Sequence, residues 1–351
     1  MKIALITDTH FGARNDSQIF TEHFMKFYDK VFFPYLEEND ITTLIHLGDL
    51  VDRRKYINYV TLNTVRRDFI FKLGDMGIDT HIIIGNHDTY YKNTNKINAV
   101  QELFTTLEGV QEPWIYEEPI VKNFDGLDIL FVPWICPENA EKTMEMLNTT
   151  TAQVLMGHLE VTGYSMYRGL VCEHGLSKKT FNKFDMVLSG HIHYKNGDGH
   201  IQYLGTPYEL MWSDVDDPKG FYVFDTDTRD MNFIVNPYKI FYKILYNDLE
   251  NEYLNRDYDE YENSYVKVIV VEKEDSYKFD LFLDRLYSFN PYDVTIIEDP
   301  LEILDTAGEL DEAEDTMTIL SKYIDGLELT VDKTRLDSLM KTLYLEAVEI
   351  E

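Results

Sequence analysis

Eight side chains that can bind metal ions or transfer protons lie in five short motifs within the first 193 residues. Carboxylate, amide and imidazole donors without thiolates suit manganese, iron or zinc in a reactive site, whereas structural zinc favours cysteine. The ordered set therefore predicts a two-metal site that hydrolyses phosphate esters. Its members are Asp8 and His10 in TDTH, Asp49 in GDLVD, Asn86 and His87 in GNHD, His158 in MGH, and His191 and His193 in SGHIH.

Each motif directly follows a short apolar run, as KIALI precedes TDTH and THIII precedes GNHD. Short apolar runs bounded by turn residues are typical of buried strands. Ligands of open α/β sheets gather at the carboxyl ends of such strands, so we expect five strand-end loops to surround one point. The glycines of the motifs fit this arrangement, because a residue without Cβ lets the backbone approach a ligand closely.

The intervening sequence is typical of helices that cover these strands. Phe20, Phe24 and Phe27 recur at helical spacing within residues 17–38, and two further helices are expected over 58–73 and 95–107. Later sequence, up to about residue 240, is richer in strands and turns. The fold class predicted is α/β, a four-layer αββα sandwich in which two sheets pack between layers of helices.

A smaller domain is expected after residue 240. The strand-like runs SYVKVIVVE and DVTIIE flank a helical segment over residues 277–289, which predicts a small α/β cap. Apolar residues follow one helical stripe near the C-terminus, over 331–350, after an acidic segment. The predicted domains are residues 1–240, a cap over 241–300, and an acidic linker with a C-terminal helical tail over 301–351.

The net charge of −31 is concentrated at the C-terminal end, because residues 240–351 carry 29 acidic and 10 basic side chains. This balance argues against a protein that binds nucleic acid alone through a broad basic face. It does not exclude a nuclease, since bound cations neutralise a scissile phosphate locally and a basic partner can supply the remaining field. A solvated acidic surface is the alternative interpretation.

The sequence indicates a folded protein of the cytoplasm. Hydrophobic residues make up 44% of the chain, and 25 Tyr and 20 Phe residues exclude general disorder. No apolar stretch is long enough to span a bilayer or to form a signal peptide. The two cysteines, Cys136 and Cys172, lack the spacing of a thiolate metal site and are expected to be reduced.

The five motifs resemble those of the calcineurin-like metallophosphoesterases over residues 1 to about 210. The whole chain is similar to the SbcD-type nuclease subunits of double-strand-break repair complexes, especially the phage recombination version. That narrower resemblance rests on YLGTPYELMWSDV after the last motif and on the cap followed by a terminal helix. It implies that residues 1–240 form a metal-dependent DNA exonuclease and endonuclease domain that acts in recombination, repair and replication.

The resemblance also implies how the ligands divide between two divalent ions. Mn²⁺ is the expected metal, with Mg²⁺, Fe²⁺ and Zn²⁺ as alternatives. Such a pair of ions polarises the phosphoryl group and acidifies the attacking water. One ion takes Asp8, His10 and His193, the other takes Asn86, His158 and His191, and Asp49 bridges both.

His87 matches the family's catalytic histidine that binds no metal. A side chain that titrates near neutral pH suits the stabilisation of developing charge or the protonation of the leaving group. Asp88 is expected to orient a neighbouring ligand. Many SbcD-type nucleases have His three positions after the bridging Asp, where this chain has Asp52, so a phosphate-holding role does not transfer. We place Asp52 with Asp88 as a supporting residue.

Three residues beside the motifs are candidates for substrate contacts. Arg53 and Arg54 follow Asp52 directly and could bind phosphate oxygens. Tyr90, just after GNHD, could stack on a splayed base. An exposed charged turn and a tyrosine packed under its loop are the alternatives.

Partners follow from the same resemblance. The chain is expected to bind DNA, to pair with an SMC-like coiled-coil ATPase through its C-terminal helix, and to dimerise through the helices over 58–73 and 95–107 within a heterotetramer. An ordinary intramolecular helix is the alternative for the C-terminus. Two other functions remain open: a phosphatase or small-molecule phosphodiesterase, because GDLVDR is also similar to a phosphoprotein phosphatase motif, and a subunit that mainly tethers DNA ends.

Overall fold

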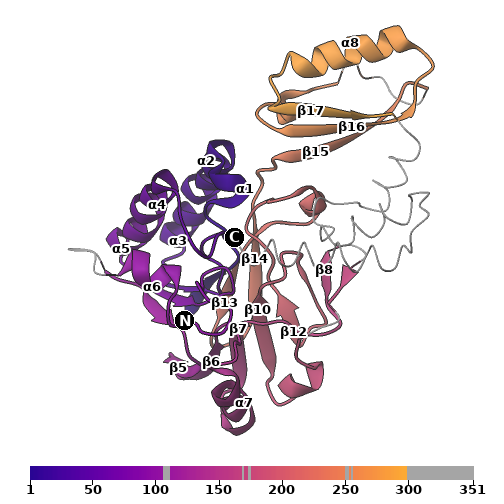
Figure 1. The fold of residues 1–351 in the computed structure, drawn as a ribbon. Coiled ribbons are helices and arrows are strands. Elements are labelled where there is room, and N and C mark those ends of the chain that lie inside the picture. The colour runs from indigo at the N-terminus through magenta and orange to yellow at the C-terminus, as the bar shows by residue number, and fades with distance from the viewer. Residues whose placement is uncertain (106–110, 168–169, 173–174, 250–252, 254–255, 299–351) are drawn as a thin grey trace, which may run out of the picture. The chain divides into compact units, whose positions relative to one another are not determined.

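The computed structural model describes residues 1–105, 111–167, 170–172, 175–249, 253 and 256–298 (Figure 1). The chain divides into two compact units, Met1–Leu210 with Asp214–Ile240, and Met211–Ser213 with the chain from Phe241 onward. All five motifs lie in the first unit. The predicted acidic linker and C-terminal helix lie outside the described residues. Among the described helices, none combines the length and apolar composition that a membrane span requires.

The first unit contains a six-stranded sheet in which three motif-bearing strands lie side by side. β1, β2, β3 and β4 are parallel neighbours, and β13 and β14 extend the sheet antiparallel at the β1 edge. Because β1, β2 and β3 run in one direction, the motifs after them open at one edge of the sheet. The strands are β14 (Met231–Val235), β13 (Gly220–Asp225), β1 (Lys2–Ile6), β2 (Thr43–His46), β3 (Asp79–Ile83) and β4 (Trp114–Tyr116), in spatial order.

A second six-stranded sheet carries the remaining two motifs. β12, β10, β7 and β6 are parallel neighbours, while β11 and β5 pair antiparallel at its two edges. The MGH and SGHIH motifs therefore also share one edge. The strands are β11 (Asn196–Gly197), β12 (Ile201–Tyr203), β10 (Met186–Gly190), β7 (Val154–His158), β6 (Leu127–Val132) and β5 (Ile120–Phe124), in spatial order.

Alternation along the strands builds a core on each face of the second sheet. Ile129 and Phe131 of β6 pack with Ile3 and other residues of the first sheet. Their neighbours Leu130 and Val132 face the opposite way, toward Leu147 of a helix. Successive strand residues point to opposite faces, so each such strand contributes to two apolar layers. The predicted αββα sandwich is confirmed.

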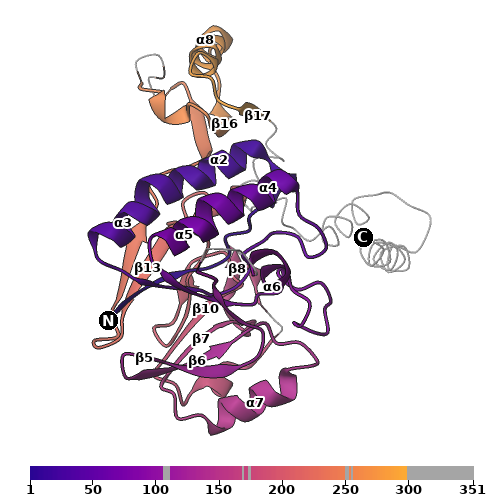
Figure 2. The same cartoon turned by 90° about the vertical axis from the view of Figure 1, so that its left-hand side faces the viewer.

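Helices form the outer layers of this sandwich (Figure 2). A continuous helical segment comprises α2 (Gln18–Phe27), η1 (Tyr28–Phe32) and α3 (Phe33–Glu38), and a second comprises α4 (Tyr59–Thr64), η2 (Val65–Phe71) and α5 (Lys72–Asp75). Both lie on the outer side of the first sheet, and α7 (Ala140–Thr149) lies on the outer side of the second. Phe20, Phe24 and Phe27 are buried, as their spacing predicted.

The helix expected over 95–107 is shorter in its described part. α6 spans Ala99–Phe104 and begins at Asn98, whose Oδ1 accepts the Gln101 backbone N–H at 2.8 Å. Such an asparagine cap satisfies one of the free N–H groups of the first turn and fixes where the helix starts. The remaining short elements of the first unit are α1 (Ala13–Asp16), β8 (Ser165–Tyr167), β9 (Leu170–Val171) and η3 (Lys178–Phe181).

In its described part, the second unit contains a three-stranded parallel sheet and the helix α8. β15 (Phe241–Asn247), β16 (Tyr265–Glu272) and β17 (Asp293–Ile297) lie in that order, and α8 (Ser276–Tyr287) connects the last two. Tyr246, Val268 and Phe282 form part of its own buried cluster. The predicted β-α-β pattern is present, and β15 adds a strand that the sequence did not predict. The short elements η4 (Trp212–Asp214) and η5 (Asp259–Tyr261) complete the description.

Candidate metal centre

The motif residues form three groups of metal-ligand type at the carboxyl ends of the parallel strands. In each group the ligand atoms lie within 4.8 Å of one another, although no group is contiguous in sequence. The first group is Asp8 with His10 and His193, the second is Asp49 with His158 and His191, and the third, which shares His10 with the first, is His10 with Asp52 and His87. Both sheets contribute to the first and second groups, because β1, β2, β7 and β10 end at the same edge of the sandwich.

In the first group, two imidazole nitrogens lie close to each other. His10 Nε2 lies 2.9 Å from His193 Nε2, and Asp8 Oδ1 lies 3.9 Å from each. All three side chains are directed at a common point. Two ring nitrogens and a carboxylate oxygen in this arrangement are the donors of a borderline divalent cation.

The amide oxygen of Asn86 lies between the two imidazoles of the second group. Asn86 Oδ1 lies 3.0 Å from His158 Nε2 and 2.9 Å from His191 Nδ1. The Trp134 ring packs beside this group, with its centroid 5.0 Å from that of His191. The indole covers one side of the imidazole pair with apolar surface.

Asp49 connects the first and second groups. Its Oδ2 lies 3.3 Å from His158 Nε2 and 3.7 Å from His10 Nε2. The carboxylate is buried, as are His10 and His158. A donor set of carboxylate, amide and imidazole atoms around two adjoining points fits a pair of divalent cations, with the Asp49 carboxylate between them.

Four of these ligands lie in turns with an unusual backbone conformation. Asp8, His10, Asp49 and His191 all have left-handed φ angles, of 51°, 42°, 55° and 86°. Residues with a Cβ rarely adopt this region, and such strain is typical of functional sites held by the surrounding fold. The turn also approaches its neighbours closely: a Cβ on Gly85 would overlap Asp49 Oδ1.

Hydrogen bonds to the far nitrogen orient two of the histidines. His158 Nδ1 donates to the Leu47 carbonyl at 2.8 Å, which leaves Nε2 for the centre. His10 Nδ1 lies 3.3 Å from Asp52 Oδ1, which directs His10 Nε2 toward Asp8 and His193. Such partners fix the tautomer and the ring orientation of a ligand. Asp52 thus orients His10, and it also belongs to the third group together with His10 and His87.

Asp88 supports the centre through hydrogen bonds to the backbone of the loops that carry its ligands. Its carboxylate is fully buried and accepts backbone N–H groups from both the GDLVD and the GNHD loops. The donors are Asp49 and Gly85 to Oδ2, each at 2.9 Å, and Leu50 and Val51 to Oδ1, at 2.9 and 3.2 Å. One carboxylate therefore holds together the two loops that supply Asp49, Asn86 and His87.

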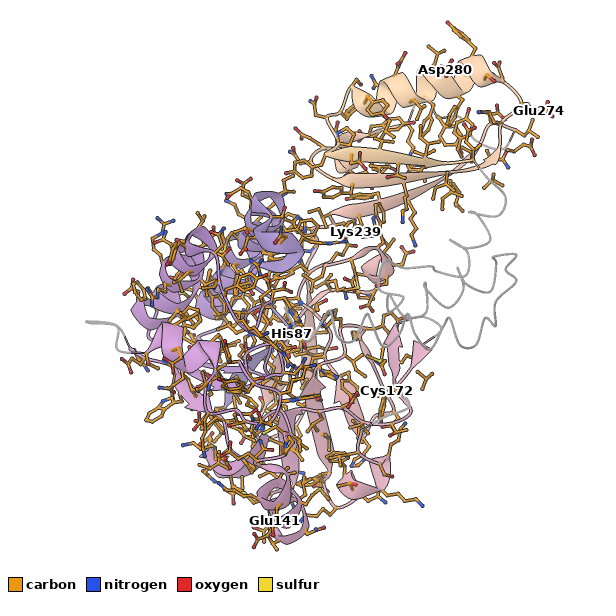
Figure 3. The ribbon with its side chains drawn as sticks, in the orientation of Figure 1. His87, Glu141, Cys172, Lys239, Glu274 and Asp280 are labelled. Atoms are coloured by element: carbon orange, nitrogen blue, oxygen red, sulfur yellow. The ribbon has the colours of Figure 1, made fainter. Side chains whose placement is uncertain are left out.

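His87 lies beside the first and second groups, where the strand-end loops meet (Figure 3). Its Nδ1 donates to the Asp52 carbonyl at 2.6 Å, and its backbone N–H donates to Asp49 Oδ1 at 2.7 Å. Its ring meets the His10 ring edge-on, with centroids 4.8 Å apart. The side chain is only partly buried, and it forms the third group with His10 and Asp52.

Electrostatics divide the histidines into two kinds. Burial opposes the charged form of His10 and of His158, but nearby carboxylates outweigh it and raise both pKa values to about 9. Asp52 and Asp49 dominate for His10, and Asp49 for His158. Burial lowers the pKa of His191 to about 3 and also lowers that of His193. The acidic ligands thus favour positive charge at the centre.

The two arginines predicted to bind substrate differ in their contacts. The Arg53 guanidinium pairs with Asp16 and donates to Asn15 Oδ1 at 3.0 Å. Arg54 Nη1 is buried without a hydrogen-bond partner among the described residues. Burial lowers the pKa of Arg54, and the negative charge of Asp49 opposes that shift. The guanidinium is therefore close enough to the centre to interact electrostatically with Asp49. Tyr90 is 40% exposed.

Three residues near the centre escaped sequence reasoning. Trp134 follows β6, whose apolar run resembled the others but ended without a ligand. His46 is buried at the end of β2, where its Nδ1 accepts the Gly48 N–H at 3.2 Å and its Nε2 contacts Thr9 Oγ1 at 3.0 Å. Lys219 is also buried, and its Nζ donates to the His193 carbonyl at 3.1 Å. None of these contacts has a local sequence signal.

Two sheets with convergent strand-end ligand groups define a metallophosphoesterase, and the chain belongs to the calcineurin-like phosphoesterases, whose family profile matches residues 1–195. It is similar over nearly its whole length to exonuclease subunit 1 of Enterobacteria phage T4, with 32% identity over 353 residues, covering 99% of this chain and 100% of that protein.

More distant similarity extends to a bacterial protein. An SbcD-type subunit of the nuclease SbcCD from Staphylococcus epidermidis is 22% identical over 261 residues, covering 66% of this chain and 67% of that protein. The structure of an archaeal phosphodiesterase is 14% identical with a TM-score of 0.34, and the match covers 67% of this chain and 100% of that one.

Proposed function

We propose that the chain is the nuclease subunit of a DNA-processing complex and hydrolyses DNA phosphodiester bonds with the help of two divalent cations. The observation that carries this proposal is the placement of the Asp49 carboxylate between two ligand groups with His87 beside them. The similarity to two nuclease subunits supports DNA as the substrate. A role in recombination, repair and replication belongs to the same proposal.

Seven residues would hold the cations: Asp8, His10 and His193 on one side, Asn86, His158 and His191 on the other, and Asp49 between them. When bound, such a pair supplies Lewis-acid polarisation of the phosphoryl group and a water that is acidic enough to attack it. Mn²⁺ is the proposed ion, with Mg²⁺, Fe²⁺ and Zn²⁺ as the alternatives that the same donors accept.

The protein's own residues position and complete the reaction. In-line attack of water on phosphorus forms one P–O bond while the bond to the sugar oxygen breaks. His87, fixed by its Nδ1–H bond to the Asp52 carbonyl, presents Nε2 to the substrate, where it stabilises developing charge or gives a proton to the departing oxygen. Arg54, with its unpaired Nη1, is the proposed contact for a phosphate oxygen.

The remaining parts of the chain are assigned roles on the same basis. We propose residues 1–240 as the nuclease domain, 241–300 as a cap and 301–351 as a linker with a helix that binds an SMC-like coiled-coil ATPase. Homodimerisation through α4 to α5 and α6, and a location in the cytoplasm, complete the proposal. The two nuclease relatives are themselves named as subunits, which supports the existence of a partner.

A nuclease assay with the full-length chain tests the proposal. Linear single- and double-stranded DNA are incubated with Mn²⁺, Mg²⁺ or a chelator, and a generic phosphomonoester is assayed in parallel. We expect Mn²⁺-dependent DNA cleavage that falls about 100- to 10,000-fold in His87→Ala while Mn²⁺ binding persists.

His200→Ala is the matched control, because this histidine bonds the Phe184 carbonyl and belongs to none of the three groups. Rapid hydrolysis of the phosphomonoester with intact DNA would favour a phosphatase. Normal processing of DNA ends by His87→Ala would favour a tethering role.

A further inference from the structure

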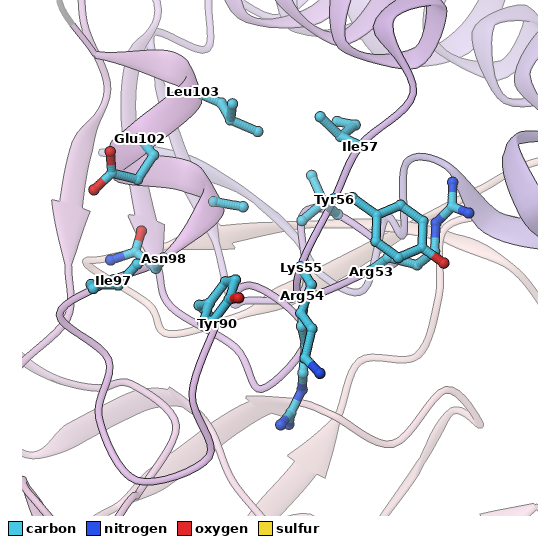
Figure 4. A pocket seen from close by; sticks show the side chains of 12 residues that line it. Arg53, Arg54, Lys55, Tyr56, Ile57, Tyr90, Ile97, Asn98, Glu102 and Leu103 are labelled. Carbon is cyan, nitrogen blue, oxygen red and sulfur yellow. The ribbon is translucent and has the colours of Figure 1, made fainter. Parts of the chain in front are cut away.

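A pocket adjoins the candidate metal centre on the side of the GDLVD and GNHD loops (Figure 4). Its walls come from Val51 and residues 53–57, which follow Asp49, from Tyr90, three residues after His87, and from α6 with the two residues before it. The same two loops therefore carry the proposed chemistry and the pocket. A ligand held there would lie next to the reacting phosphate.

The pocket is apolar and aromatic. Tyr56 and Tyr90 provide rings, while Ile57, Ile97 and Leu103 provide aliphatic surface. The cavity between these side chains has a volume of about 160 Å³, which lies below the usual range for sites that bind drug-sized molecules, so its occupant must be small. Tyr56 is 64% exposed but has the Arg53 guanidinium over its ring, 4.6 Å from the centroid, whereas Tyr90 is 40% exposed and is the ring offered to a flat ligand.

Three cations, Arg53, Arg54 and Lys55, and the Glu102 carboxylate line the pocket, and Arg54 is the cation placed to hold an anion beside the metal centre. Arg54 lines the pocket with its side chain, yet its guanidinium responds to the charge of Asp49 and has a buried Nη1 without a partner among the described residues. Arg53 is committed to Asp16 and Asn15. An aromatic pocket with an adjacent unpaired guanidinium matches a nucleotide, with the base inside and the phosphate outside.

We propose that this pocket binds the base of the nucleotide next to the scissile phosphate, after that base has left the helical stack. The proposal rests on the nuclease function proposed above and refines its substrate to an unpaired strand end. Stacking on tyrosine tolerates any base, since every base offers a π face. The pocket therefore confers a requirement for an unpaired nucleotide without a preference for sequence.

The test uses equilibrium binding without cleavage. Full-length His87→Gln protein with Mn²⁺ is titrated into short single-stranded oligonucleotides that each carry one 2-aminopurine at a different distance from an end. We expect quenched fluorescence at one position only. With Tyr90→Ala added, the quenching is lost and the affinity falls about tenfold, the value of one base–aromatic stack.

Tyr277→Ala in the same background is the matched control, because Tyr277 is a tyrosine that is 70% exposed and does not line the pocket. Its quenching profile should equal that of the parent. Quenching at no position, or quenching that survives Tyr90→Ala, overturns the pocket.

Cleavage of the unlabelled oligonucleotides by the unmodified chain separates the two proposals. Cleavage of DNA without a 2-aminopurine response supports the proposed nuclease function and contradicts the proposed base-binding pocket. DNA that is neither cleaved nor bound removes both.

Discussion

The carboxylate of Asp88 accepts the backbone N–H of Asp49 at 2.9 Å, so one buried acid fixes the turn that carries another. Burial and the charge of Asp49 raise the pKa of Asp88 to about 7, against its backbone N–H donors, which favour the carboxylate. This bond belongs to a set of four that joins the GDLVD and GNHD loops. The position of the proposed bridging ligand therefore depends on a residue that is not itself a proposed ligand.

Replacing Asp88 with Asn should weaken the centre without removing a ligand. In asparagine an NH₂ group, which can only donate, replaces one of the two carboxylate oxygens of Asp88. The backbone N–H groups that this oxygen accepts in the unmodified chain would then be buried without an acceptor. We expect Mn²⁺ affinity to fall about 10- to 100-fold, as is typical when the partner of a ligand is lost. Calorimetric titration measures this change, and the exposed Glu141→Gln serves as the control. Unchanged affinity would show that the loops hold their positions alone.

The division of ligands into two groups predicts separable ions. His193 belongs to the group of Asp8, and His191 to that of Asp49, although the two histidines are only two residues apart. His191→Ala and His193→Ala should each lower the bound Mn²⁺ from two ions to one, measured by metal analysis after equilibrium dialysis. His200→Ala should keep both. If either ligand variant retained two ions, the two-group assignment would be wrong.

Lys219 is predicted to stabilise both the fold and the first ligand group. Its buried ammonium donates to Asp214 and Asp217 at 2.8 Å each, as well as to the His193 carbonyl. Lys219→Met leaves two buried carboxylates without their cation, which should cost about 3–5 kcal/mol in the free energy of unfolding. Urea denaturation measures this loss.

Lys239→Met, at an exposed lysine, should be nearly neutral in the same experiment. Since Lys219 also holds the backbone of His193, the Lys219 variant should bind Mn²⁺ more weakly at temperatures where it is still folded. A stable variant with full metal affinity would contradict both expectations.

Metal binding should release protons near neutral pH. The pKa values of His10 and His158 are raised from 6.5 to about 9, so both imidazoles are protonated at pH 7 in the metal-free protein. A cation must displace those protons, and the apparent Mn²⁺ affinity should rise with pH until about 9. Calorimetry in buffers with different ionisation enthalpies measures the release. Binding without proton exchange at pH 7 would refute this assignment of charge.

The same shift has the opposite effect on the metal-free fold. A histidine whose pKa is raised on folding contributes stability that is fully present below pH 6.5 and is lost as the pH rises through 9. In the presence of a chelator, the urea midpoint should therefore fall between these pH values. Saturating Mn²⁺ should reduce or reverse the decline, because its affinity increases over the same interval.

The sequence predicts which residues lie together at the strand ends, because the signals for this placement are local. An apolar run that ends in Asp, Asn or His identifies both a buried strand and the edge at which its ligand lies, as for Asp8 and His158. Contacts between distant segments carry no such signal: the pairing of Arg53 with Asp16 depends on how two loops meet. Lys219 lies in an acidic segment that reads as surface, and only the fold shows that it is buried. Residues 299–351, which contain the predicted partner helix, lie outside the described structure.

Asp8, His10, Asp49 and His191 lie in left-handed turns. At each of these positions, folding and metal-dependent catalysis favour different residues. Glycine adopts these backbone angles without the strain that a Cβ brings, and asparagine tolerates them better than histidine does. A library randomised at the four positions and selected only for folding should therefore enrich glycine and asparagine. A library selected for metal-dependent cleavage should retain Asp and His, so the difference between the two outcomes would measure how strongly the chemistry constrains evolution at each turn.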